Sequence, residues 1–217
     1  MNIKGILFDF DGTLANTIPL CIRAYQHVFE QYTGRTCTAS EVMSHFGTTE
    51  AGIFQRTIPD RWQDAFQSYL EIYKKLHTEC PAPFDGIEHI LRKLDERGIA
   101  LAVVTGKGEE CALFSLEYLG LARYFDIVEV GDTKAIIKAA AMRKILDAWR
   151  MEPRCAAYVG DAASDMEEAA AAGVLPLGAC WSETATIHHL TTIQPFATFN
   201  SVADFDVWLD QHIANGA

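Results

Sequence analysis

Short apolar runs alternate with helical patterns along most of the chain. The runs have the length and β-branched content of strands that are buried on both faces of a parallel sheet. Between them, apolar residues recur at helical spacing, as in Ile87, Ile90, Leu91 and Leu94, which Gly98 follows as a C-cap candidate. This alternation predicts an α/β fold in which helices cover both faces of an open parallel sheet. The predicted strands are Ile3–Phe10, Ile99–Val104, Phe125–Val130, Cys155–Val159 and Val174–Leu177. Further helices are predicted at Leu113–Leu119, Ile136–Trp149 and Met166–Ala172.

One long segment interrupts the alternation. From about Asn16 to Pro83 no strand pattern is found, and one helical pattern follows another. Pro81 and Pro83 mark the return to alternating strands and helices. The sequence therefore predicts two parts, a core of residues 1–15 and 83–217 and a helical insert of residues 16–82. The predicted helices of the insert are Thr17–Tyr32, with Asn16 or Thr17 as N-cap, Ser40–Phe46, Glu50–Thr57 and Arg61–Leu76.

Composition narrows the possible partners. The chain has 217 residues and a formal net charge of −11, which argues against binding to nucleic acid because phosphate backbones need a basic surface. No apolar run approaches the length of a membrane span, and we expect no membrane partner. The six cysteines are scattered without CxxC spacing, which is typical of reduced thiols in a cytoplasmic protein. The N-terminus opens directly into a strand pattern, so we expect no signal peptide.

The most informative residues follow the predicted strands. Asp9 and Asp11 come directly after the first strand, and Thr105 comes after the second. Asp161 follows the fourth strand, and Asp165 comes four residues later. Because the carboxyl ends of parallel strands lie at one edge of a sheet, where ligands bind, we expect these side chains to converge.

Such a cluster of carboxylates favours phosphoryl chemistry. Several acids held together need a cation, and oxygen ligands without His or Cys suit Mg²⁺ better than Zn²⁺. Asp9 is positioned to attack phosphorus and to form an aspartyl-phosphate. Asp11 is positioned to protonate the leaving oxygen, provided that Gly12 turns the chain. Backbone N–H groups around Asp11 and Gly12 are expected to cradle the phosphate.

Four ordered motifs resemble those of the haloacid dehalogenase superfamily of phosphatases. Asp9-Phe10-Asp11-Gly12-Thr13-Leu14 resembles the first motif, and Thr105 the second. Lys138 resembles the lysine of the third, with Lys134 as the alternative, and Gly160–Asp165 resembles the fourth. The resemblance covers almost the whole chain and implies a Rossmann-like core with a small α-helical cap. Phosphoglycolate phosphatases, bacterial pyrophosphatases and β-phosphoglucomutases have a cap of this kind.

The resemblance also implies a role for each residue. Asp9 is expected to be the nucleophile and a Mg²⁺ ligand. Asp11 is expected to be the general acid and base and to bind Mg²⁺ through its carbonyl. Asp161 completes the protein ligands of Mg²⁺, and Asp165 binds it directly or through water. The residues expected to hold the substrate phosphate are Gly12, Thr105, Gly106 and Lys138.

The chain departs from the family pattern at two points. Ala15-Asn16-Thr17 stands where relatives with this cap often have Asp-Ser at the second and third positions. Ala139 follows Lys138 where many relatives have proline, and this keeps Lys134 open as the phosphate-binding lysine.

Several other residues have two interpretations. Lys107 is expected to face solvent near the rim of the site, and His188-His189 to be a surface pair. Trp181 either lines the rim or packs in the core. The segment Phe46–Glu50 either resembles the cap loop that faces the catalytic site or is an ordinary turn between helices.

The leading prediction is a Mg²⁺-dependent phosphatase that hydrolyses a small phosphorylated metabolite, such as a phosphoglycolate-like ester or pyrophosphate. Closure of the cap would exclude bulk water and select the substrate. One alternative is a phosphomutase similar to β-phosphoglucomutase. An alternative of another class is a non-catalytic phosphate sensor or phospho-acceptor. The sequence leaves open whether the chain is a monomer or a homodimer.

Overall fold

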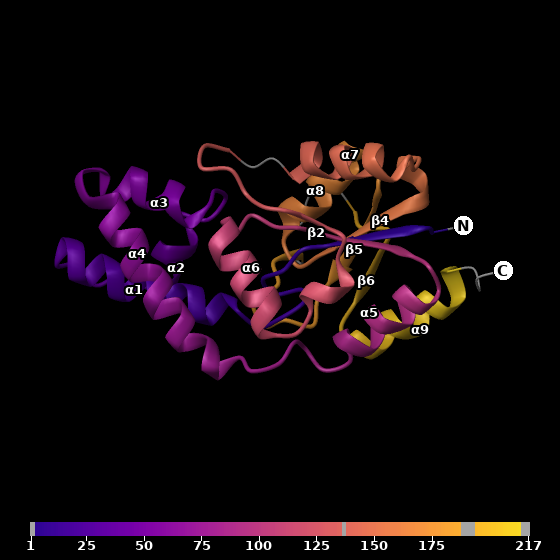
Figure 1. Cartoon of the computed structure of the whole chain (residues 1–217), viewed down its shortest axis with the longest axis horizontal. Coiled ribbons are helices and arrows are strands. Elements are labelled where there is room, and N and C mark those ends of the chain that lie inside the picture. The colour runs from indigo at the N-terminus through magenta and orange to yellow at the C-terminus, as the bar shows by residue number, and fades with distance from the viewer. Residues whose placement is uncertain (1–2, 136–137, 188–193, 214–217) are drawn as a thin grey trace.

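The computed structural model describes residues 3–135, 138–187 and 194–213. Within these residues six parallel strands form one sheet in the order β3-β2-β1-β4-β5-β6 (Figure 1). This order places β1 in the middle, between β2 and β4. The strands are β1 (Gly5–Phe8), β2 (Ala100–Val104), β3 (Ile127–Glu129), β4 (Ala156–Gly160), β5 (Leu175–Ala179) and β6 (Ala197–Phe199).

The predicted fold class is confirmed, with one strand added. Each of the five predicted strands overlaps an observed one. The sixth, β6, has only three residues at the edge of the sheet, where it pairs with β5. A run this short lacks the periodicity that would identify a strand in the sequence.

Helices cover both faces of the sheet. α5 (Ile87–Glu96) and α9 (Val202–His212) lie on one face, and α7 (Lys138–Trp149) and α8 (Ala163–Ala172) lie on the other (Figure 1). Side chains of β1 alternate between the two layers, because successive residues of a strand point to opposite faces. Leu7 packs in the cluster that contains residues of α7 and α8. Its neighbours on either side pack with residues of α5 and α9.

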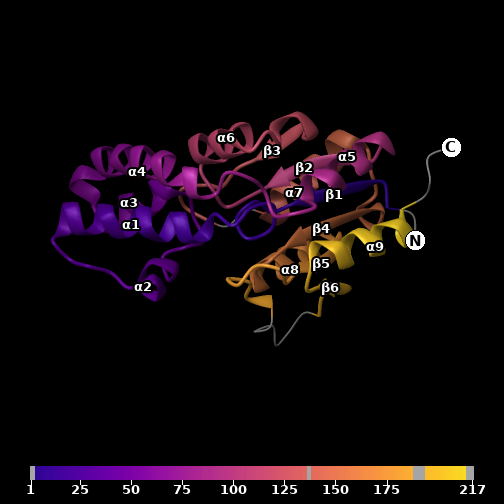
Figure 2. The same ribbon diagram turned by 90° about the horizontal axis from the view of Figure 1, so that it is seen from below.

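The helices between β1 and α5 gather beyond one end of the sheet (Figures 1 and 2). Their shared core is aromatic: the rings of Tyr25 and Tyr69 lie 4.5 Å apart, and those of Phe54 and Tyr69 lie 5.8 Å apart. The helices are α1 (Ile18–Thr33), α2 (Ala39–Met43), α3 (Glu50–Thr57) and α4 (Trp62–Leu76). The remaining helix is α6 (Glu109–Tyr118), and short 3₁₀ helices occur at Pro59–Arg61, His77–Glu79, Ala122–Tyr124 and Pro153–Cys155.

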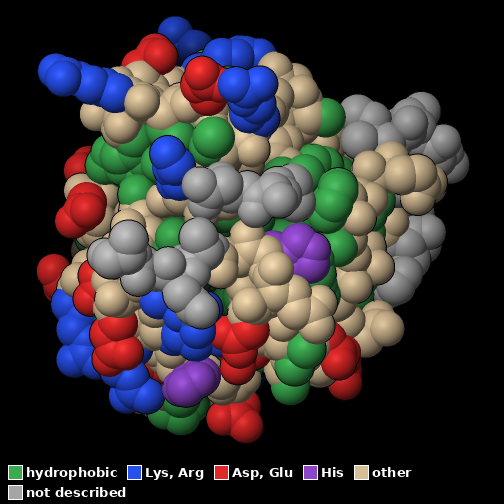
Figure 3. All heavy atoms as spheres, turned by 90° about the vertical axis from the view of Figure 1, so that its right-hand side faces the viewer, with side chains coloured by type: hydrophobic (Ala, Val, Ile, Leu, Met, Phe, Trp, Pro, Cys, Tyr) green, Lys and Arg blue, Asp and Glu red, His purple; other side chains and the backbone are tan. Residues whose placement is uncertain are grey.

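The surface at the end of the core opposite these helices is mixed in character. Acidic and basic side chains are interspersed there, with hydrophobic side chains between them (Figure 3). Among the described helices, none combines the length and the apolarity needed to cross a membrane.

Candidate active site

Three polar side chains lie at the ends of neighbouring strands. Asp9 follows β1, Thr105 follows β2 and Asp161 follows β4. The backbone N–H of Asp9 donates to the carbonyl of Val159 at 2.8 Å, which extends the pairing of β1 and β4 up to the site. All three side chains line a cavity of about 190 Å³, which also has residues of the helical insert in its wall. The convergence expected from the strand ends is therefore present.

The carboxylates of Asp9, Asp161 and Asp165 form a buried cluster. One oxygen from each lies within 4.8 Å of the others. Burial raises the pKa of Asp9 from 3.8 to about 7, with Lys138 opposing the shift and Asp165 adding to it. Burial also raises the pKa of Asp161 to about 9, and the neighbouring charge of Asp9 adds to this shift. Ionised together, these carboxylates would carry more negative charge than their protein partners neutralise, so the cluster favours a bound cation.

Lys138 partly compensates that charge. Its Nζ lies 3.0 Å from Oδ1 of Asp9 and 2.6 Å from Oδ1 of Asp165. Burial by itself lowers the pKa of Lys138, but the carboxylates of Asp165 and Asp9 outweigh burial and raise that pKa well above its usual value. Lys134, the alternative lysine, is exposed, and its backbone N–H donates to Asp132. The structure therefore brings Lys138 to the cluster and leaves Lys134 outside it.

Asp165 is held by protein groups on both of its oxygens. Oδ1 accepts from Lys138, and Oδ2 accepts from the backbone N–H of Ala162 at 3.0 Å. Asp165 thus serves as an acid in the first turn of α8, as well as a partner of the lysine. The cluster offers only oxygen donors, and its raised pKa values indicate a site that a cation would neutralise. These donors fit Mg²⁺, with Asp9 and Asp161 as the carboxylates less committed to other partners.

The turn after β1 separates Asp11 from this cluster. Gly12 has a φ of 78° and an added Cβ there would overlap the carboxylate of Asp161, so this position requires glycine. The Gly12 N–H donates to the carbonyl of Ala15 at 2.9 Å, so its contribution to the site is the turn itself. Asp11 turns toward the helical insert, where Oδ1 accepts from Oγ1 of Thr17 at 2.6 Å.

Thr17 occupies the position before α1, as predicted, but its side chain does not cap the helix. Its hydroxyl bonds to Asp11 instead. The first turn of α1 is therefore tied to the loop that carries the acid.

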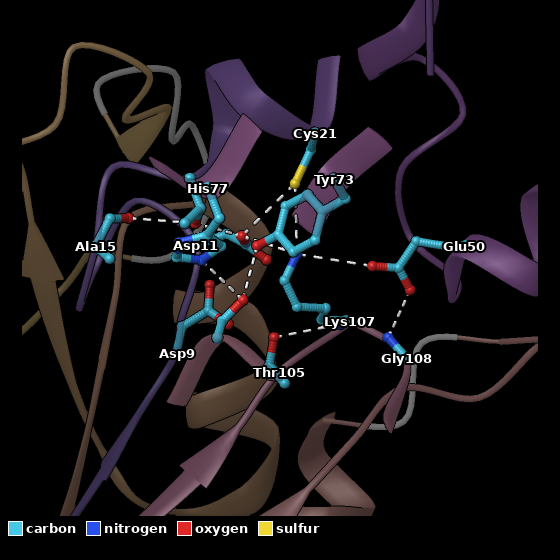
Figure 4. A network of polar contacts seen from close by, with 12 residues as sticks. Asp9, Asp11, Ala15, Cys21, Glu50, Tyr73, His77, Thr105, Lys107 and Gly108 are labelled. Atoms are coloured by element: carbon cyan, nitrogen blue, oxygen red, sulfur yellow. Dashed lines mark hydrogen bonds and ion pairs between the residues drawn. The ribbon is translucent and has the colours of Figure 1, made fainter. Parts of the chain in front are cut away.

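The position of Lys107 differs from the one predicted. It was expected to face solvent near the rim, yet it is only 4% exposed and lies beneath the helical insert (Figure 4). Its Nζ lies 3.1 Å from Oδ1 of Asp11, 3.6 Å from Oε1 of Glu50 and 3.3 Å from Sγ of Cys21. The ring of Tyr73 lies 4.6 Å from the same nitrogen. Two carboxylates compensate the loss of hydration, and this makes the burial of the lysine possible.

The loop Phe46–Glu50 faces the site rather than forming an ordinary turn. Phe46 and Glu50 both line the cavity. Oε2 of Glu50 accepts from the backbone N–H of Gly108 at 2.6 Å, and the N–H of Thr49 donates to the carbonyl of Asp132 at 3.2 Å. The helical insert is thus docked on the core through the loops that follow β2 and β3. Sequence reasoning missed Glu50 as a site residue, although it pointed to its loop.

Comparison with known proteins agrees with this geometry. Residues 6–179 match the family model described as haloacid dehalogenase-like hydrolase. The chain belongs to this family. A pyrophosphatase PpaX from Halalkalibacterium halodurans is 30% identical over 176 residues, which cover 80% of this chain and 82% of that protein. A phosphoglycolate phosphatase from Aquifex aeolicus is 28% identical, over 97% of this chain and 99% of that protein.

The fold of this haloacid dehalogenase-like hydrolase is also found among solved structures. CbbY from Rhodobacter sphaeroides, in complex with phosphate, has a TM-score of 0.79 at 22% identity, over 94% of this chain and 96% of that one. Because the curated relatives are phosphatases and pyrophosphatases that match over most of their length, the predicted class of enzyme, a phosphatase of this family, is confirmed. The comparisons do not favour the phosphomutase or phospho-acceptor alternatives.

A second polar network joins the insert of the hydrolase to its core. The hydroxyls of Tyr73 and Ser115 lie 2.8 Å apart, and Nε2 of His77 lies 3.1 Å from the Ser115 hydroxyl. Burial lowers the pKa of His77, and the positive charge of Lys107 lowers it further. The network links the end of α4 to α6.

Trp181 does not line the cavity. Trp181 is partly buried against the core: its Nε1 donates to the carbonyl of Thr13 at 3.1 Å, and its ring lies 5.9 Å from that of Phe205. Of its two interpretations, packing is the one that these contacts support. His188-His189 and Ile136 lie outside the described residues.

Proposed function

We propose that this hydrolase is a Mg²⁺-dependent phosphatase that acts on a small phosphorylated metabolite through an aspartyl-phosphate at Asp9. The observation that carries the proposal is the buried group of Asp9, Asp161 and Lys138 at the strand ends. A nucleophile, metal-binding carboxylates and a phosphate-binding cation are the parts that phosphoryl transfer needs.

Asp9 and Asp161 would hold the metal, with the carbonyl of Asp11 and with Asp165, either directly or through water. Mg²⁺ bound there would neutralise charge on the phosphate oxygens. Lys138 lies beside Asp9, where it can pair with the incoming phosphate. In the proposed complex the Thr105 hydroxyl and the backbone at Gly106 hold the other phosphate oxygens.

The reaction proceeds in two steps. A carboxylate oxygen of Asp9 forms a bond to phosphorus while the bond from phosphorus to the leaving oxygen breaks, and Asp11 gives that oxygen its proton. Water then attacks the phosphorus of the aspartyl-phosphate and transfers a proton to Asp11. The bond from phosphorus to Asp9 breaks, and inorganic phosphate leaves.

We propose that residues 16–82 act as a cap over a core of residues 1–15 and 83–217. The contacts of Glu50 and Thr49 with core loops support this division, because they hold the insert against the wall of the cavity. A cap in this place excludes bulk water from the aspartyl-phosphate and selects the leaving group. We also propose a cytoplasmic location, which the six free cysteines support.

The test is the substitution Asp9→Asn. With p-nitrophenyl phosphate and Mg²⁺, we expect hydrolysis to fall by at least about 10³-fold, because an amide neither attacks phosphorus nor binds the metal as a carboxylate does. The control is Asp95→Asn, at an exposed position of α5. Turnover by Asp9→Asn at the wild-type rate would refute the mechanism.

A further inference from the structure

The cap side of the cavity is almost uncharged. Among the described residues of the insert that line the cavity, Glu50 is the single charged one. No lysine or arginine of the insert is in that wall. Arg56, on the same helix as Glu50, does not line the cavity; its guanidinium donates to Oγ1 of Thr48, which does, and to the carbonyl of His45. The apolar and aromatic residues of the wall are Ile18, Cys21, Tyr25, Phe46, Ile53 and Tyr69.

Two core lysines also line the cavity, and carboxylates already bind both. Lys138 pairs with Asp9 and Asp165 at the phosphate end. Lys107 faces the leaving-group side, where Asp11 and Glu50 both pair with its ammonium. When Asp11 is protonated to act as the acid, Glu50 still balances the charge of Lys107, so this side of the cavity offers no free cation.

The carboxylate of Glu50 cannot easily turn away to release the lysine. Glu50 is the first residue of α3 and is 5% exposed. Its Oε2 is held by the backbone N–H of Gly108 at 2.6 Å. Thr49 anchors the start of the same helix by accepting from the N–H of Gly52 at 3.3 Å. The negative charge is therefore a fixed part of the wall.

We propose that this wall selects phosphate esters whose leaving group is uncharged, and that Glu50 acts as the residue that rejects a second anion. A carboxylate or second phosphate on the leaving group would find no free cation there, because Glu50 already neutralises Lys107. An anion buried without a partner is unfavourable, whereas an alcohol carbon chain fits the apolar wall. The proposal rests on the proposed phosphatase function and narrows its substrate class.

The test compares 2-hydroxyethyl phosphate with phosphoglycolate, which have nearly the same shape but differ by one carboxylate. In the wild-type protein with Mg²⁺, we expect kcat/KM for 2-hydroxyethyl phosphate to be at least about tenfold higher. Glu50→Gln keeps the size of the side chain and removes its charge. We expect this variant to lower the ratio of kcat/KM for 2-hydroxyethyl phosphate to kcat/KM for phosphoglycolate about tenfold, mainly by raising kcat/KM for phosphoglycolate. Glu96→Gln, at an exposed end of α5, is the matched control and should leave the ratio unchanged.

Two further measurements keep the outcomes separate. Activity of Glu50→Gln on p-nitrophenyl phosphate and its thermal melting show whether the cap still folds. Inhibition constants of both esters against p-nitrophenyl phosphate give the same comparison if their own turnover is slow. A wild-type preference for phosphoglycolate, or an unchanged ratio in a folded Glu50→Gln, overturns the inference while Asp9-dependent hydrolysis stands. Hydrolysis of every ester by Asp9→Asn at the wild-type rate overturns the proposed function and the inference together.

Discussion

Replacing Lys107 by methionine should destabilise the protein strongly. Methionine keeps the apolar stem but removes the ammonium, so the carboxylates of Asp11 and Glu50 are left facing each other without a cation. The side chain of Lys107 is 1% exposed, that of Glu50 6% and that of Asp11 17%. Removing one partner from such a buried group costs about 3–5 kcal/mol. In a chain of this size each kcal/mol lowers Tm by about 2–4 °C, so we expect Tm to fall by about 10 °C.

The assay is thermal unfolding followed by circular dichroism at pH 7. Four proteins are compared: the wild type, Lys107→Met, Glu50→Gln and the double variant. Because the second substitution removes one of the two stranded carboxylates, the double variant should lose less stability than the two single variants added together. We expect the difference to be at least about 1.5 kcal/mol.

A surface ion pair provides the control. The side chain of Lys144 is 72% exposed and its Nζ lies 2.6 Å from Oε1 of Glu129. Solvent screens such a pair, so Lys144→Met should melt within about 2 °C of the wild type. If Lys107→Met also melts within that range, or if its effect on stability adds fully to that of Glu50→Gln, the ion pairs of Lys107 with Asp11 and Glu50 do not stabilise the docked insert.

The remaining predictions concern phosphate binding, docking of the insert and the metal. Lys138→Met should lower kcat/KM by at least about 10²-fold, whereas Lys134→Met should match the wild type. Equal losses in the two variants would contradict the assignment of Lys138 as the phosphate-binding lysine. Gly52→Ala should lower Tm and activity, because the added Cβ would overlap a backbone carbonyl of the loop after β3. Helix propensity alone predicts that alanine raises the stability by about 1 kcal/mol, so a rise in Tm would contradict the predicted overlap. Without metal, the raised pKa values of Asp9 and Asp161 mean that the folded protein binds more protons than the unfolded protein between about pH 4 and 9. Its Tm in EDTA should therefore fall as pH rises through this range, and added Mg²⁺ should raise Tm more at pH 9 than at pH 5; an equal effect of Mg²⁺ at both values would contradict this.

The residues at the strand ends could be predicted because a simple rule of parallel sheets governs them. Asp9, Thr105 and Asp161 each follow an apolar run that is readable on its own, and the sheet brings the carboxyl ends together whatever covers them. The family pattern favoured Lys138 but left Lys134 open, and only the structure, which brings Lys138 to Asp9 and Asp165, separates the two lysines.

The burial of Lys107 could not be predicted in this way. A lysine after a strand is ordinarily solvated, and nothing in the residues next to it says otherwise. Its environment is made by Glu50, which is 57 positions earlier in the chain, and by Tyr73 on α4. Those contacts exist only once the insert has docked on the core, and docking is decided by the shape of whole helices rather than by a local pattern.

The same contacts change how a substitution of Asp11 must be interpreted. Loss of activity in Asp11→Asn would ordinarily be credited to the loss of a proton donor. Here the carboxylate of Asp11 also neutralises Lys107 and accepts from Thr17, so it helps to hold the first helix of the insert and the buried lysine in place. A neutral amide weakens both contacts, and a displaced insert would lower activity even if proton transfer were not limiting. Lys107→Met perturbs the docking while leaving the acid itself intact. Only the part of the loss that Asp11→Asn shows beyond Lys107→Met, on a substrate whose leaving group needs a proton, measures the contribution of Asp11 as an acid.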